Sequence, residues 1–117
     1  MSGFIKNITD NEIDLIETSG IINKEKITYL HQQDKYTLKK LSSNKVIIQR
    51  NNDLINSTYI FELGKVIPSQ YYIKGEGLTL EIDIKTNFLK ITDNMIYIAY
   101  TIIDSNTDYQ YKIEMSE

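Results

Sequence analysis

The sequence predicts an all-β fold, a closed antiparallel meander barrel of about eight to ten strands, and three observations carry that prediction. Twenty-one isoleucines and nine tyrosines accompany a single alanine, a bias toward β-branched and aromatic side chains that favours strands. Apolar and polar residues alternate over long stretches. Clusters of turn-forming residues separate these stretches, and no stretch long enough for a helix shows apolar residues at helical spacing.

Polar clusters mark the predicted turns. Asn, Asp, Ser and Gly adopt left-handed or side-chain-bonded turn conformations more readily than other residues, so these clusters indicate where strands end. They lie at residues 9–12, 23–26, 42–44, 51–53, 64–69, 74–77, 92–94 and 104–108. Because the connections are short, we expect strands that follow one another in sequence to be antiparallel neighbours.

The strands before residue 51 are predicted from composition and turns. Residues 12–22 are rich in β-branched side chains and contain Ser19-Gly20, which favours a bulged strand over a helix. Residues 35–50 predict a hairpin, because two arms flank a Ser42-Ser43-Asn44 turn. Within the second arm, residues 46–48 form an apolar run without a clear polar side.

The strands after residue 54 show the clearest alternation. In residues 55–63 and 78–84, apolar side chains occupy most of every second position. The apolar phase slips after Phe88, so we predict a break or bulge near Thr86-Asn87. Residues 96–103 are apolar at both sets of alternating positions, so this strand is predicted to be apolar on both faces.

The number of strands raises the question of closure. A meander of this length leaves two unpaired edges unless the sheet closes on itself, and closure removes both edges. We therefore favour a closed barrel over an open sandwich. The chain has no repeat, no low-complexity tract and no linker rich in Gly, Ser or Pro. Residues 1–117 are therefore predicted to form a single domain with one core.

Residues that carry catalytic or metal chemistry are sparse. The chain has no cysteine and one histidine, His31, which precedes a predicted turn. Glu81 and Asp83 share a strand face, but polar residues continue that face, so we expect it to be solvent-exposed. Residues 104–108 begin like a calcium loop but lack its glycine and closing glutamate, and residues 10–14 fail in the same way. We therefore predict no enzyme activity, no metal site and no cofactor.

The sequence shows no sign of export or membrane insertion. Its N-terminal residues lack the apolar core of a signal peptide, and no apolar run approaches membrane-spanning length. The absence of cysteine excludes a disulfide framework. We expect a cytoplasmic protein that does not enter membranes.

Tyrosines and the single arginine are the candidates for ligand contact. Aromatic rings with a few hydroxyls, projecting inward from a barrel wall, suit a small apolar or amphipathic ligand in a cavity of roughly 300 Å³ or more. The alternative is that the rings fill the core, as in many small barrels. The sole arginine either anchors a carboxylate or carbonyls within the fold or contacts the ligand. The candidate ligand-binding residues are Tyr29, Arg50, Tyr59, Tyr71 and Tyr100.

Two other functions remain open. Residues 35–50 carry five basic and no acidic residues, and a basic strand pair with a tyrosine can follow a phosphate backbone and stack a base. The net charge of −3 disfavours this single-stranded nucleic-acid binding. Strands that are apolar on both faces, at 46–48 and 96–103, indicate instead a protein-interaction or homodimer module. The candidate nucleic-acid-binding residues are Lys35, Tyr36, Lys39, Lys40 and Lys45.

A series of different short motifs is spread along most of the chain. They are Thr18-x-Gly20, Ile27-x-Tyr29-Leu30, Thr37-Leu38-Lys39, Val46-Ile47-Ile48-Gln49-Arg50, Phe61-Glu62-x-Gly64-Lys65, Tyr71 or Tyr72, Gly77-Leu78-x-Leu80-x-Ile82-x-Ile84-x-Thr86 and Ile96-x-Ile98-x-Tyr100. In order and spacing they resemble the YwiB-like family of small bacterial calycin (lipocalin-like) β-barrels, whose function is unknown. Where the family has a glycine after the arginine, this chain has Asn51-Asn52, residues that also tolerate a left-handed turn. The resemblance implies a lipocalin-like barrel and, by analogy only, small-ligand binding.

Overall fold

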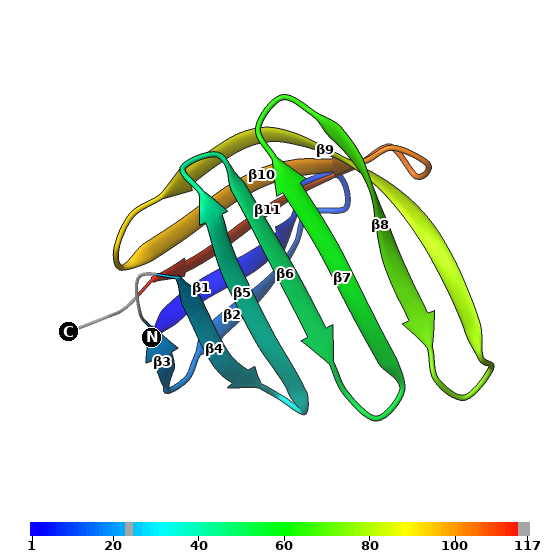
Figure 1. Cartoon of the computed structure of the whole chain (residues 1–117), viewed down its shortest axis with the longest axis horizontal. Helices are drawn as coiled ribbons and strands as arrows, with labels where there is room; N and C mark the ends of the chain where they lie inside the picture. The colour runs from blue at the N-terminus through cyan, green and yellow to red at the C-terminus, as the bar shows by residue number, and fades with distance from the viewer. Residues whose placement is uncertain (23–24, 115–117) are drawn as a thin grey trace.

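The computed structural model describes residues 1–22 and 25–114, and within that part of the chain it contains eleven β-strands and no helix (Figure 1). The predicted all-β class is therefore confirmed, and none of the described residues belongs to a helix able to cross a membrane. In chain order the strands are β1 (Ser2–Asn7), β2 (Glu12–Glu17), β3 (Gly20–Ile22), β4 (Lys26–His31), β5 (Asp34–Ser42), β6 (Lys45–Asn51), β7 (Ile55–Glu62), β8 (Val66–Ile73), β9 (Leu78–Ile91), β10 (Met95–Ile102) and β11 (Thr107–Glu114).

All described strands belong to one antiparallel sheet with the order β2-β1-β11-β10-β9-β8-β7-β6-β5-β4-β3. From β3 to β11 each strand pairs with the next one in sequence, as the short connections predicted. The N-terminal hairpin of β1 and β2 then adds to the sheet through the pairing of β1 with β11. The strand count exceeds the predicted eight to ten, because residues 12–22 form two strands interrupted at Thr18 and Ser19.

The prediction of a closed barrel is wrong. The sheet curls into a half-barrel, with β5 to β8 in front of β9, β10, β11 and β1 in Figure 1, and it remains open between its edge strands β2 and β3. These two edges are consecutive segments of the chain, separated only by Thr18 and Ser19. Two residues are enough for a hairpin turn, yet β2 and β3 do not pair with each other, and each stays at its own edge of the sheet.

Side chains bridge the open edge where backbone pairs do not. The Thr18 hydroxyl donates to the Leu30 carbonyl at 2.6 Å, and His31 Nε2 lies 3.1 Å from Asp14 Oδ2. We call this contact region between β2 and β4 the seam. Next to it, a Cβ on Gly20 would lie 2.5 Å from the Thr28 carbonyl oxygen, so only glycine allows the β3 and β4 backbones to approach this closely.

The predicted bulge in the long strand β9 is confirmed. On β10, Ala99 pairs with Phe88 and Tyr100 pairs with Thr86, which leaves Asn87 as the extra residue. The Asn87 side chain instead donates to the Thr101 hydroxyl at 2.9 Å. The bulge changes which set of alternating positions points inward, so that Thr86 is buried before it and Leu89 is buried after it.

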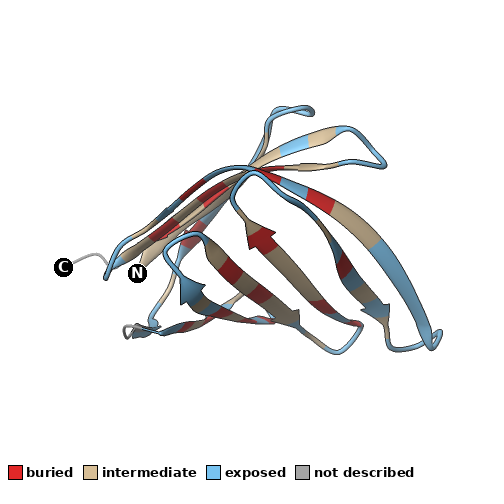
Figure 2. Cartoon of the chain, turned by 45° about the horizontal axis from the view of Figure 1, so that its top comes forward, coloured by how far each residue is buried: buried red, intermediate tan, exposed pale blue. Residues whose placement is uncertain are grey.

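The core lies between the front and back layers of the curled sheet. Buried positions recur at every second residue on both layers, and they appear as separated red segments along the strands in Figure 2. Branched aliphatic side chains with no exposed surface fill one end of this interior; they include Ile27, Leu38, Val46, Ile96, Ile98 and Ile113. The other end is built mainly from tyrosines, and there the packing is incomplete.

Candidate functional site

A cavity of about 200 Å³ lies in the tyrosine-rich end of the interior. One wall comes from β5, β6 and β7, and it consists of Tyr36, Ile48, Arg50, Ser57, Tyr59 and Phe61. The opposite wall comes from β1, β10 and β11, and it consists of Ile5, Tyr100, Ile102, Tyr109 and Tyr111. The cavity therefore joins the two layers of the half-barrel.

The register of the sheet explains why these side chains meet. Tyr36 pairs with Arg50, and Arg50 pairs with Ser57, so the three form one row across β5, β6 and β7. Directly opposed residues of neighbouring strands point to the same face of a sheet. The row therefore places one arginine and the short side chain of a serine beside a large ring, and the serine leaves space that a longer residue would fill.

Arg50 is held in place by a polar network at the edge of the cavity. Its Nε donates to Asp34 Oδ2 at 2.7 Å, and Asn52 Nδ2 donates to Asp34 Oδ1 at 2.7 Å. Burial alone raises the pKa of Asp34, but the hydrogen bonds from Asn52 and Arg50 outweigh it and lower that pKa below its usual value. Asp34 is thus a carboxylate at neutral pH, and Arg50 anchors it, which was one of its two predicted roles.

The Asn52 side chain also stabilises the turn that follows β6. Its Oδ1 accepts hydrogen bonds from the backbone N–H groups of Leu54 and Ile55, at 2.8 and 2.9 Å. This side-chain-bonded turn replaces the left-handed turn that the resemblance suggested, because neither Asn51 nor Asn52 has a positive φ. The turn therefore fixes the position of the Asn52 side-chain amide, which donates to Asp34.

Several hydroxyl groups in the cavity have no protein partner. Tyr100 is 7% exposed and Ser57 is 4% exposed, yet neither hydroxyl forms a hydrogen bond with any residue that the structure describes. The hydroxyls of Tyr36 and Tyr59 are also unpaired within residues 1–22 and 25–114. Among the fully buried side-chain polar atoms of the described residues, only Thr86 Oγ1 lacks a partner, so these cavity hydroxyls keep some accessible surface, where water or a ligand can bind them.

Burial keeps the cavity tyrosines protonated. It raises the pKa of Tyr59 to about 12, and it raises the pKa of Tyr36 and of Tyr100 as well. At neutral pH these phenols are therefore neutral hydrogen-bond donors rather than bases.

Aromatic contacts make the walls rigid. Tyr36 stacks on Tyr29 with ring centroids 4.9 Å apart, and Tyr100 stacks on Tyr109 at 5.2 Å. The hydroxyls of Tyr29 and Tyr111 are hydrogen-bonded to each other in the core. Stacked and bonded rings cannot rotate into the free space without losing these contacts.

The structure brings some of the candidate ligand-binding residues together and not others. Arg50, Tyr59 and Tyr100 line the cavity. Tyr29 lies behind the wall, stacked on Tyr36, and Tyr71 is half-buried on β8 and does not line the cavity. The sequence reasoning missed a further set of residues in the cavity or its support: Asp34, Asn52, Ser57, Tyr109 and Tyr111.

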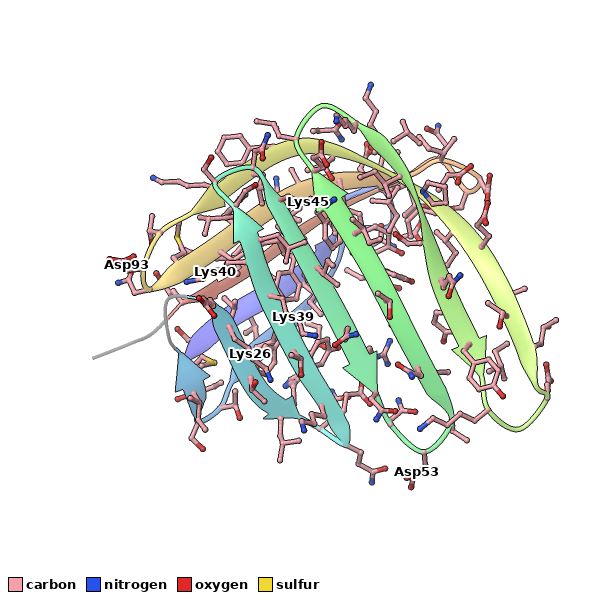
Figure 3. All side chains as sticks on the ribbon, viewed as in Figure 1. Lys26, Lys39, Lys40, Lys45, Asp53 and Asp93 are labelled. Carbon is pink, nitrogen blue, oxygen red and sulfur yellow. The ribbon has the colours of Figure 1, made fainter. Side chains whose placement is uncertain are left out.

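The basic hairpin places its tyrosine on one face of the sheet and its exposed lysines on the other. Tyr36 points into the cavity, whereas Lys35 and Lys39, at the alternate positions of β5, are exposed. Figure 3 shows Lys39 beside Lys26, its partner in register, on the outside of β4 and β5. No tyrosine of this hairpin therefore lies among its lysines. The β5 alternation alone would have placed Tyr36 inside.

Two of the remaining lysines are occupied by local contacts. Lys40 Nζ donates to the Thr92 carbonyl at 3.0 Å, and Lys45 Nζ lies 3.6 Å from Glu62 Oε1. The described residues also contain no group of three or more His, Cys, Asp or Glu side chains placed to hold a metal ion.

Comparison with known proteins supports the fold. The sequence matches no protein-family model, and no curated protein matches it. The crystal structure of the ywiB protein from Bacillus subtilis is similar, with a TM-score of 0.66 over 98% of this chain and 88% of that chain, at 17% sequence identity. At this identity the likeness concerns the fold alone. The chain thus shares its curled antiparallel sheet with the Bacillus subtilis ywiB protein.

Proposed function

We propose that this protein is a cytoplasmic, non-enzymatic binding protein whose lipocalin (calycin)-like interior holds a small apolar or amphipathic molecule. The observation that carries the proposal is the cavity in which the nearly buried hydroxyls of Tyr100 and Ser57 lack protein partners. These hydroxyls border open space, so a ligand can supply the hydrogen bonds that the protein does not.

The volume limits the size of the ligand. About 200 Å³ is less than the roughly 300 Å³ that a drug-sized ligand requires, so the cavity does not enclose a molecule of that size. An apolar cavity of about 150 Å³ holds one benzene ring. A single-ring molecule with a small polar group therefore matches the space.

The side chains around the cavity support binding rather than catalysis. Asp34 has hydrogen bonds on both carboxylate oxygens, and the raised pKa values of the tyrosines leave no phenolate at neutral pH. His31 does not line the cavity; it contacts Asp14 at the seam. General acid–base catalysis needs a group whose pKa lies near the working pH, and the cavity lining offers none.

Native mass spectrometry of the purified protein tests the proposal, followed by an NMR titration with benzyl alcohol, a neutral single-ring probe. Ser57→Val adds methyl groups inside the cavity, whereas the control Thr58→Val changes the next residue of β7, which points away from it. We expect a bound small molecule, or shifts of cavity amides on adding benzyl alcohol, in the natural protein and the control. Ser57→Val should weaken either signal. The absence of both signals in the natural protein would contradict the proposal.

An interaction module is the second candidate, and the edge strand β2 favours it. Leu15 is 70% exposed and Ile13 is 58% exposed on a strand whose outer edge forms no backbone pairs. Beside them on the outer face, Phe4 and Phe88 each pack edge-on against Tyr97. An unpaired edge with apolar side chains is a template for pairing with a second chain. Sedimentation at increasing concentration should show a dimer that Leu15→Lys abolishes; a monomer throughout would exclude it.

A further inference from the structure

Arg50 lines the cavity with a side chain that is 39% exposed, and most of its hydrogen-bond donors are unused. A guanidinium group has five N–H donors, and only the one on Nε is engaged, by Asp34 at 2.7 Å. The two terminal nitrogens form no hydrogen bond with any residue in the described part of the chain, and Arg50 lines the cavity. Asp34 thus holds the side chain at its inner nitrogen and leaves the outer fork of the guanidinium available. That fork matches a carboxylate, which it binds through two parallel hydrogen bonds.

The rest of the cavity lining also favours an anion. Arg50 is the only charged residue that lines the cavity. Asp34 binds the arginine but is not part of the lining. The lining hydroxyls without a partner among the described residues are those of Ser57, Tyr36, Tyr59 and Tyr100, and hydroxyls can donate to an oxygen of the ligand. No acceptor-only group faces the space.

The walls select a ring. Phe61, Tyr100 and the stacked pair Tyr36–Tyr29 border the space with flat, rigid surfaces, and Ile5 and Ile48 complete it with apolar side chains. Aromatic pairs prefer offset-stacked or edge-to-face contacts, which these walls offer to a planar ligand. The volume of about 200 Å³ matches the size of one ring.

Asp34 opposes anion binding and limits its strength. Its charge compensates that of Arg50, so a doubly charged phosphate gains little electrostatic energy here, whereas a monocarboxylate is recognised mainly through directional hydrogen bonds. From these observations we infer that the ligand is a single-ring aromatic monocarboxylate, whose carboxylate binds the terminal nitrogens of Arg50 while its ring lies among the tyrosines. This inference rests on the proposed function, since it assigns a chemical class to the ligand of the same cavity.

Calorimetric titration of the full chain with three probes tests the inference: benzoate, benzamide and acetate. Benzamide has the size and shape of benzoate without its charge, and acetate has the charge without the ring. Because charge-assisted bidentate hydrogen bonds are about twice as strong as neutral ones, we expect benzoate to bind at least about tenfold more tightly than benzamide. Acetate should bind more weakly than benzoate, because it leaves the aromatic space empty.

Arg50→Gln should abolish the preference for benzoate over benzamide. Since this change leaves the Asp34 carboxylate with one partner fewer and can impair folding, the double variant Arg50→Gln with Asp34→Asn repeats the test without a buried charge. Lys39→Gln is the matched control, because it removes a positive charge from the outer face of β5 and should change neither affinity.

The outcomes separate this inference from the proposal on which it rests. Equal affinity for benzoate and benzamide in the natural protein would overturn the carboxylate assignment and leave cavity binding standing. A benzoate preference that persists in both Arg50 variants would also overturn it, because the anion would then bind elsewhere. If neither ring compound binds the natural protein, the inference fails, and native mass spectrometry with the benzyl alcohol titration then decides whether the proposed function stands.

Discussion

The two ends of the same curled interior differ in how completely they are filled. Along β6 the inner face passes from Val46, which has no exposed surface, to Arg50 at the cavity, and along β10 it passes from Ile96 to Tyr100. Branched aliphatic side chains adapt to one another and pack to the density of a crystal. Planar rings fixed by stacking, with the short Ser57 between them, do not interdigitate. One interior can therefore provide stability at one end and a binding space at the other.

The largest effect should come from the filled end. Leu38→Ala removes a side chain with no exposed surface, so we expect a loss of about 3 kcal/mol in the free energy of unfolding, measured by urea denaturation. Leu41→Ala, on the same strand but exposed, is the control and should cost less than about 0.5 kcal/mol. Similar losses for both variants would show that the filled end is not packed as described.

The polar network of Asp34, Arg50 and Asn52 beside the cavity should make the next largest contribution to the free energy of unfolding. Asp34→Ala removes the acceptor for both Arg50 and Asn52, and we expect a loss of about 2 kcal/mol at pH 7. Because the folded-state pKa of Asp34 is lowered, this contribution is fully present above the unfolded-state pKa of about 4 and disappears as the pH falls through the lower folded-state value. Urea denaturation from pH 7 downward should therefore show the natural protein approaching the variant in acid; a constant difference would contradict the network.

Two tyrosine hydroxyls offer a sharper comparison, because one has a partner and the other does not. Tyr111→Phe breaks the hydrogen bond with the Tyr29 hydroxyl and should cost about 1 kcal/mol in the free energy of unfolding. Tyr100→Phe removes a buried hydroxyl without a protein partner and should change that free energy by less than about 0.5 kcal/mol. Thermal unfolding in the absence of ligand measures both, and equal losses would indicate that Tyr100 is hydrogen-bonded.

The smallest effect should come from the seam. His31→Ala removes the contact with Asp14, whose carboxylate is half exposed, so we expect a global loss below about 1 kcal/mol. Local opening should increase more clearly than global unfolding, because β2 and β3 are edge strands without backbone pairing to each other. Hydrogen exchange of the β2 and β4 amides measures it. Unchanged exchange there would mean that the seam does not depend on this contact.

The sequence by itself determined the strands, the hairpin of β5 and β6, and the bulge at Asn87, because alternation and turn chemistry are local properties of a few neighbouring residues. It also marked Arg50, Tyr59 and Tyr100, which line the cavity. The alternation of apolar and polar residues along β5 already indicated that Tyr36 points inward. The local positive charge led instead to its prediction as a nucleic-acid-binding residue.

Only the tertiary structure decided whether the sheet closes and whether its interior is empty. Among the described strands, β2 pairs with β1 and β3 pairs with β4 but not with each other, although only Thr18 and Ser19 separate them in sequence. The cavity follows from the register of β11 with β1 and β10, which places Tyr109 and Tyr111 opposite a row that contains Ser57. Both depend on which distant residues face each other across two layers, and free volume is a property of such facing surfaces rather than of any segment alone.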